Sequence, residues 1–261
     1  MAGTPQEHEP VRGAQRLFLI VDRLSAKPMT LTEVARETDL PKSTALRFLR
    51  TLEEGEWVYR DQTGVYSLGA AIAGLAAQYL SGDPLVGAAT PPMRALRAEL
   101  DETISLSRRV GLSRVCVQEF PSTQNLRLVL GLGEQGPLHA GASGLLLFAY
   151  MPDEERARLA EMGFARYTDC TPTSLGELEG EVERIRAQGW ALTRGQRTEG
   201  GLAIAVPVYS PSGEVAALGV YGPEIRCATR REQERWRGEL SAAAADINAM
   251  TVRTGAPRTV R

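Results

Sequence analysis

Residues 31–50 decide the fold of the N-terminal part of this chain, and they read LTEVARETDLPKSTALRFLR. The stretch predicts two short amphipathic helices joined by a tight turn. Thr30 and Glu33 form a capping-box pattern at the start of the first helix. Pro41 opens the second, because proline is favoured at the first helical position. The apolar face of the first helix comprises Leu31, Val34 and Ala35, and that of the second Ala45, Leu46, Leu49 and Leu52.

The open face of the second helix carries basic and small hydroxyl side chains. A helix-turn-helix protein presents such groups to the major groove of DNA from the N-terminal end of its second helix. We therefore expect a DNA-binding domain, although a small helical domain with a solvated surface remains the plainer alternative. The predicted base-edge contacts are Ser43, Thr44 and Arg47, and the predicted phosphate contacts are Lys42, Arg50 and Arg60.

The flanking sequence supports a winged form of this motif. Apolar residues recur at helical spacing in residues 16–25, which predicts a third helix. After Gly55, the runs WVYRD (57–61) and VYSLG (65–69) are separated by QTG, the pattern of a β-hairpin. A hairpin directly after the second helix would be a wing, and its tip at 60–64 would reach the DNA backbone or minor groove.

Length and composition narrow the class of protein. A chain of 261 residues with a net charge of −2 suits two globular domains. No apolar run of membrane-spanning length and no signal peptide is visible, so we expect a cytoplasmic protein without membrane contact. Cys116, Cys170 and Cys227 match no metal-ligand spacing and no disulfide framework. We expect neither a metal nor a cofactor.

Residues 68–80 are rich in alanine and leucine and predict a linker helix, whose apolar surface would pack on its own domain or on the same helix of a second subunit. A second domain follows. Its helices and strands are mixed without strict alternation, which predicts an α+β fold with an antiparallel-rich sheet. The expected helices are 92–102, 142–151, 153–162, 174–189 and 230–253; the expected strands are 104–110, 114–120, 126–132, 190–194, 202–209 and 215–221.

The chain resembles IclR-family bacterial transcriptional regulators over nearly its whole length. The resemblance is carried by residues 31–61 and 65–69 above, then GASGLLLFAYMPDEERARL (141–159), IRAQGWALTRGQ (185–196) and LAIAVPVYSPSGEVAALGVYGP (202–223). It implies a winged helix-turn-helix, a linker helix and a GAF-like effector domain. It also implies a homodimer or homotetramer that binds palindromic double-stranded operators and responds to small organic acids or aromatic catabolites. The expected boundaries are a disordered arm (1–10), the DNA-binding domain (11–68), the linker (69–82), the effector domain (83–254) and a tail (255–261).

Small residues at two places in the second domain predict an effector cavity. One group precedes an apolar helix, whose N-terminus presents backbone N–H groups and a positive dipole end to an anion. Close helix–strand packing would also use glycine there, and the resemblance favours the cavity. The predicted effector-binding residues are Gly141, Ala142, Ser143, Gly144, Gly201 and Ala203. The apolar strands 202–208 and 215–220 would line the remainder.

His139 and Ser143 lie close in sequence and invite comparison with a hydrolase. A catalytic pair needs a third group that orients the histidine and an oxyanion hole, and no GxSxG motif is present. We therefore expect no catalytic residues, with His139 structural or a hydrogen-bond partner in the cavity. The favoured function is an effector-controlled regulator of transcription. The alternative is a small-molecule sensor or enzyme module whose winged helix mediates protein contacts.

Overall fold

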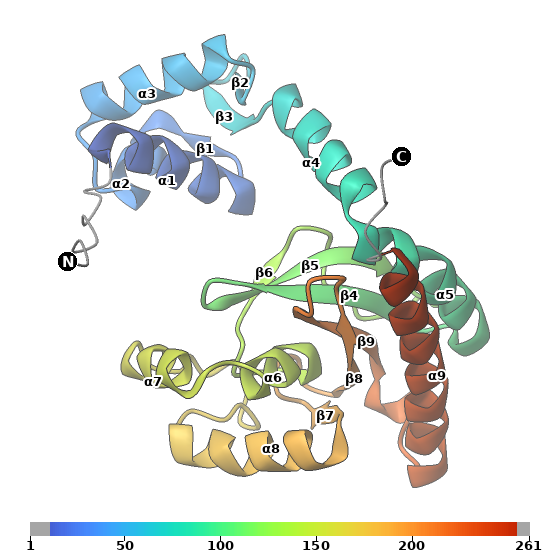
Figure 1. The fold of residues 1–261 in the computed structure, drawn as a ribbon. Helices are drawn as coiled ribbons and strands as arrows, with labels where there is room; N and C mark the ends of the chain where they lie inside the picture. The colour runs from blue at the N-terminus through green and yellow to red at the C-terminus, as the bar shows by residue number, and fades with distance from the viewer. Residues whose placement is uncertain (1–10, 255–261) are drawn as a thin grey trace, which may run out of the picture. The chain divides into compact units, whose positions relative to one another are not determined.

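The computed structural model describes residues 11–254, so the expected arm at 1–10 and tail at 255–261 lie outside it. The chain divides into two compact units, with the division between Tyr79 and Leu80. The α+β class predicted from the sequence is confirmed in both units (Figure 1). The expected boundaries 11–68, 69–82 and 83–254 stay a prediction, because the division falls inside the expected linker helix.

The N-terminal unit is a three-helix core with a small sheet. Its helices are α1 (Arg12–Ala26), α2 (Leu31–Glu37) and α3 (Lys42–Glu54). Strands β1 (Met29–Thr30), β3 (Val65–Leu68) and β2 (Val58–Arg60) pair antiparallel in that order. The capping box at α2 is confirmed, since Thr30 and Glu33 bond each other's backbone N–H groups. Buried Ile20, Val34 and Leu49 join the three helices in one apolar core.

Helix α4 (Ala70–Gly82) follows the hairpin directly. The backbone N–H of Gly69, just before the helix, donates to Trp57 O at 2.8 Å, and Ala71 N donates to Glu56 O at 3.2 Å. These bonds attach the start of α4 to the wing. No side chain of α4 is buried, although the helix is mostly apolar, and Leu75 is 49% exposed.

A six-stranded antiparallel sheet forms the centre of the C-terminal unit, in the order β6-β5-β4-β9-β8-β7. The strands are β4 (Thr103–Val110), β5 (Ser113–Phe120), β6 (Gln135–Gly136), β7 (Ala191–Arg194), β8 (Gly201–Tyr209) and β9 (Val215–Pro223). The first and last strands of this sheet along the chain, β4 and β9, pair with each other at its centre. The sheet therefore joins segments that lie far apart in the sequence of the C-terminal unit.

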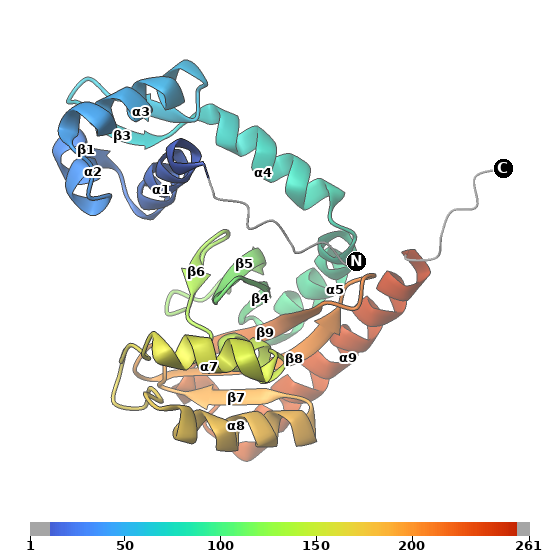
Figure 2. The same cartoon turned by 60° about the vertical axis from the view of Figure 1, so that its left-hand side comes forward.

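Helices cover both faces of this sheet (Figures 1 and 2). On one face lie α5 (Pro84–Leu100) and α9 (Arg230–Thr254), packed on Leu106, Leu218 and Val220. The other face carries α6 (Ala142–Ala149) and α8 (Leu175–Gln188), packed on Ala205 and Ala217. The remaining helices are α7 (Asp153–Glu161) and the short η1 (Glu224–Arg226).

One predicted strand was wrong, and one predicted helix begins earlier than expected. Residues 126–132 form no strand, because the segment runs as a loop that is tied to β5 by side-chain rather than ladder hydrogen bonds. The helix expected from 92 begins at Pro84 instead. Asp83 caps that helix by accepting from Leu85 N and Val86 N, and the chain continues helical through Pro91 and Pro92. Within 11–254, no helix is long and apolar enough to cross a membrane.

Candidate nucleic-acid interface and effector cavity

Helix α3 presents the side chains that the sequence assigned to DNA. Its inner face buries Ala45, Leu49 and Leu52 against α1 and α2, which fixes the opposite face toward solvent. The turn before it is set by Asp39, whose positive φ of 52° and neighbouring Leu40 N→Ala35 O bond reverse the chain. On the outer face Lys42, Ser43, Arg47 and Arg50 are exposed, and Thr44 is half-buried.

The wing lies in the same unit and carries one of the predicted phosphate contacts. The Arg60 guanidinium is 5.4 Å from the centre of the Tyr66 ring, a cation–π distance. Asp61 sets the turn by accepting from Thr63 N and Val65 N, both at 2.9 Å. The hydrogen bond from the Thr63 hydroxyl is the largest cause that lowers the pKa of Asp61. The wing tip therefore holds a carboxylate beside Arg60, and α3 carries three exposed cationic side chains, Lys42, Arg47 and Arg50.

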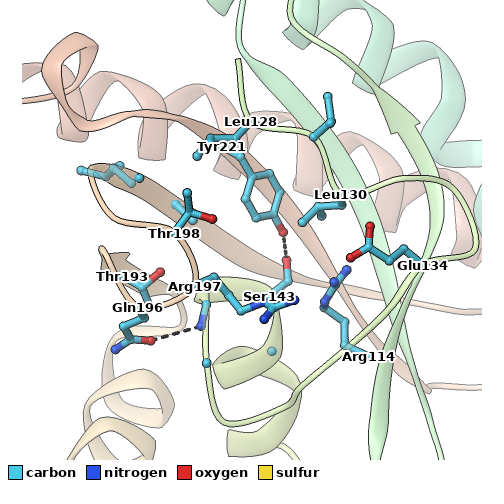
Figure 3. Close-up of a pocket in the computed structure, with 17 residues that line it drawn as sticks. Arg114, Leu128, Leu130, Glu134, Ser143, Thr193, Gln196, Arg197, Thr198 and Tyr221 are labelled. Atoms are coloured by element: carbon cyan, nitrogen blue, oxygen red, sulfur yellow. Dashed lines mark hydrogen bonds between the residues drawn. The ribbon is translucent and has the colours of Figure 1, made fainter. Parts of the chain in front are cut away.

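A cavity of about 240 Å³ opens at the N-terminal end of α6 (Figure 3). Five of the six predicted effector residues line it: Gly141, Ser143, Gly144, Gly201 and Ala203. Ala142 does not; its side chain is buried in the core between α6 and the sheet. The two small-residue segments are thus brought together, although 56 residues separate Gly144 from Gly201 in the sequence.

The glycines serve close packing as well as space. A Cβ atom at Gly144 would lie 2.5 Å from Pro137 O, and one at Gly201 would lie 3.0 Å from Thr198 O. Gly141 precedes α6 with a φ of 84°, a conformation that favours glycine. Both interpretations of these glycines therefore apply: backbone approaches closely at Gly144 and Gly201, and all three glycines line the cavity without a side chain.

The backbone N–H of Gly141 already has a partner. Gln196 Oε1 accepts it at 3.1 Å, where the sequence placed an effector anion (Figure 3). The segment that carries Gln196 is itself held from the loop before α8. Thr168 Oγ1 donates to Gly195 O at 2.6 Å, and Thr171 Oγ1 donates to Gln196 O at 2.8 Å. This chain's own amide oxygen thus satisfies the first donor of the helix start.

Polar side chains from the sheet form a part of the cavity that the sequence analysis missed. Tyr221 of β9 and Ser143 of α6 share a hydrogen bond between their hydroxyls. Burial raises the pKa of the Tyr221 phenol, which keeps it protonated. Arg114 of β5 donates from Nη1 to Ser107 Oγ at 3.3 Å. Figure 3 shows Arg114, Ser143 and Tyr221 directed toward the same part of the cavity.

The apolar wall comes from an unexpected segment. Leu128, Val129 and Leu130 line the cavity, and they belong to the loop that the sequence predicted as a strand. Glu119 of β5 holds this loop by accepting from Leu130 N at 2.7 Å and Gly131 N at 3.1 Å. The expected lining by strands 202–208 and 215–220 was largely wrong. Leu202 and Ala203 line the cavity, whereas Val206, Val208, Ala216, Leu218 and Val220 pack in the core that contains α5 and α9.

The groups that suggested a hydrolase are engaged elsewhere. The hydroxyl of Ser143 bonds Tyr221, and His139 Nε2 lies 2.9 Å from Ala165 O. The His139 ring also packs on Phe164 and Tyr167. Burial raises the pKa of the Cys116 thiol to about 12, so it is not a thiolate nucleophile. Among residues 11–254, no three His, Cys, Asp or Glu side chains cluster as metal ligands.

Comparison with protein families matches both units. Residues 13–62 match the IclR helix-turn-helix domain, and residues 77–249 match the bacterial transcriptional regulator IclR C-terminal domain. The chain belongs to the IclR family. The resemblance stated from the sequence is thereby confirmed. IclR proteins of this kind are regulators of transcription rather than enzymes.

Relatives and solved structures agree with this IclR assignment. The transcriptional repressor AllR of Escherichia coli K12 is 29% identical over 239 residues, which cover 88% of each chain. An IclR transcriptional regulator from Alicyclobacillus acidocaldarius superposes with a TM-score of 0.82 at 25% identity, over 93% of this chain and 100% of that one. An IclR homologue from Microbacterium hydrocarbonoxydans, solved in complex with 4-hydroxybenzoate, has a TM-score of 0.72 at 22% identity, over 89% and 99%.

Proposed function

We propose that this IclR-family chain binds a specific double-stranded DNA operator through α3 and that a small organic anion in the α6 cavity controls its operator affinity. The observation that carries the proposal is the pairing of two units in one chain. One presents a winged helix-turn-helix with an exposed basic helix, and the other holds a cavity with polar and apolar walls.

The exposed face of α3 supports specific rather than purely electrostatic binding. An arginine can bond guanine bidentately, and a threonine methyl can contact the methyl group of thymine. We assign base-edge contacts to Ser43, Thr44 and Arg47. Phosphate contacts are assigned to Lys42, Arg50 and Arg60. The net charge of −2 fits this division, because the basic surface is local.

The chemistry of the cavity supports an acid as the effector. Two arginines and one glutamate line it, Arg114, Arg197 and Glu134, which gives a balance of +1. The Microbacterium relative, solved with the aromatic acid 4-hydroxybenzoate, has the same fold. We assign Gly141, Ala142, Ser143, Gly144, Gly201 and Ala203 to the effector site, with Ala142 acting through the position of the helix start.

We further propose that the protein works as a homodimer or homotetramer. Helix α4 is mostly apolar and buries none of its side chains within one chain. A two-fold arrangement of helix-turn-helix units would match a palindromic operator.

Fluorescence anisotropy with labelled DNA from the protein's own promoter tests the proposal. Arg47→Ala is expected to weaken specific binding by about 5- to 150-fold, the equivalent of about 1–3 kcal/mol for one bidentate contact. Arg23→Ala, at an exposed arginine on α1, is the matched control and should bind like the parent. Equal affinity of Arg47→Ala and the parent, with unchanged circular dichroism, would contradict the assignment.

A further inference from the structure

The cavity contains a buried cation, Arg114. Its side chain rises from β5 and is 4% exposed. The guanidinium lies against Gly136 of β6, where a Cβ atom would come within 2.4 Å of Arg114 Nη2. Because Gly136 pairs with Arg114 across the two strands, the missing side chain is what admits the guanidinium to the cavity wall.

Arg114 is buried without a direct carboxylate partner among residues 11–254. Its hydrogen bond goes to the neutral hydroxyl of Ser107, and it forms no ion pair with a carboxylate in the described part of the chain. Glu134 is the acid that lines the cavity, and its side chain is exposed. A guanidinium has five N–H donors, and a buried cation without a counter-ion is costly. An anion in the cavity would satisfy both requirements.

A second orphaned group lies in the strand next to Arg114. Ser105 of β4 is fully buried, and its Oγ atom has no hydrogen-bond partner among the described residues. Ser105 pairs with Gly219 of β9, whose missing side chain leaves room for the Tyr221 and Ser143 hydroxyls. Buried polar groups are normally paired, so unpaired ones point to something absent.

We propose that Arg114 binds the carboxylate of the effector, with the apolar body of the acid against Leu128, Leu130 and Leu202. This inference rests on the function proposed above and changes the position of the anion within the same cavity. The start of α6 is the weaker candidate, because Gln196 already accepts the Gly141 N–H. Arg114 of the sheet thus binds the carboxylate of the ligand, and the ligand class is a small carboxylic acid with an apolar body.

Paired probes test the role of Arg114 in the full-length protein. The acids are benzoate and 4-hydroxybenzoate, and the neutral partners are benzamide and 4-hydroxybenzamide. Binding is measured by calorimetry and by the rise in melting temperature that a ligand of the folded state produces. We expect the parent to prefer each acid over its amide. Arg114→Met, which keeps an unbranched apolar stem and removes the charged guanidinium, should weaken acid binding by about tenfold or more and leave amide binding unchanged.

Two further variants separate Arg114 from the general charge of the cavity. Arg197→Met removes the other cavity arginine, which is exposed and stacks 4.0 Å above Tyr167, and should have a smaller effect on acid binding. Glu134→Gln removes the nearby negative charge and should strengthen acid binding. If Arg114→Met does not fold, Arg114→Lys replaces it, since lysine keeps the charge but loses the bidentate fork, and weaker acid binding is again expected.

The outcomes distinguish the two proposals. If Arg114→Met, or Arg114→Lys in its place, binds the acids as tightly as the parent, the Arg114 assignment is overturned and the anionic effector stands. A larger loss in Arg197→Met than in the Arg114 variant also overturns it. If none of the acids binds the parent protein, both the anionic effector and the Arg114 assignment are overturned.

Discussion

The hydroxyl pair of Tyr221 and Ser143 offers a direct test of how the cavity is built. Tyr221 is 7% exposed and Ser143 is 2% exposed, so neither hydroxyl has ready access to bulk water. Tyr221→Phe removes one partner and leaves the Ser143 hydroxyl buried. Ser143→Ala does the reverse and leaves the phenol buried. Changing both removes the hydrogen bond together with both polar groups.

The expected magnitudes follow from this geometry. A buried group that loses its hydrogen-bond partner costs about 1–3 kcal/mol. Each single change should lower the free energy of unfolding of the C-terminal unit by that amount. The double change should cost less than the sum of the two, with a difference of about 0.5–3 kcal/mol, because the second substitution removes the group that the first one orphaned.

Urea unfolding followed by tryptophan fluorescence measures these costs in the full chain. The protein has three tryptophans, of which Trp57 lies in the N-terminal unit, and Trp190 and Trp236 lie in the C-terminal unit. A Trp57→Phe background therefore restricts the signal to the unit under test. Shifts of the midpoint at an unchanged dependence on urea report stability alone. Single costs that add up to the double within about 0.5 kcal/mol would refute the shared hydrogen bond.

Three other outcomes are expected. Light scattering at micromolar concentration should give a mass at least twice the 28.3 kDa of one chain, and a mass of one chain both free and on DNA would contradict the role given to α4. Gly201→Leu places side-chain atoms where a Cβ alone is 3.0 Å from Leu128 and Thr198; it should lose the response to acids in DNA-binding assays but bind the operator without ligand. Burial lowers the pKa of His139 below its ordinary value, so the unfolded chain takes up more protons below about pH 6.5 and stability falls on acidification. Melting temperatures between pH 7.5 and 5 should therefore fall more steeply in the parent than in His139→Phe, and parallel curves would count against a buried neutral histidine.

Local signals in the sequence predicted much of the fold. The capping boxes at Thr30 and Ser174 mark helix starts that the structure confirms, because each depends on residues within one turn. The hairpin of the wing is equally local. The start of α5 is also set by a local cap, which the sequence analysis did not identify. The helix was expected from Pro92, but Asp83 caps a helix that begins at Pro84 and continues through Pro91 and Pro92.

The cavity lining could not be predicted in full, because it depends on contacts between segments that are far apart in the sequence. Leu128 and Leu130 alternate as in a strand, yet their loop is held by the carboxylate of Glu119. Arg114 and Tyr221 meet the start of α6 because β4 pairs with both β5 and β9, and that strand order is set by the whole sheet. An arginine in a strand is ordinarily expected to face solvent. Its burial beside Gly136 becomes visible once the pairing of β5 with β6 is known.

The bond between Gln196 and Gly141 has a consequence for the affinity of effector binding. The amide oxygen acts as an internal competitor, tethered at high local concentration to the donor that it occupies. An acid that also engages the Gly141 N–H would bind to the fraction of molecules in which Gln196 has swung away, and its apparent dissociation constant rises as that fraction falls. The threonine bonds of the Gln196 segment would then set the sensitivity threshold of the regulator, at positions that the effector never touches.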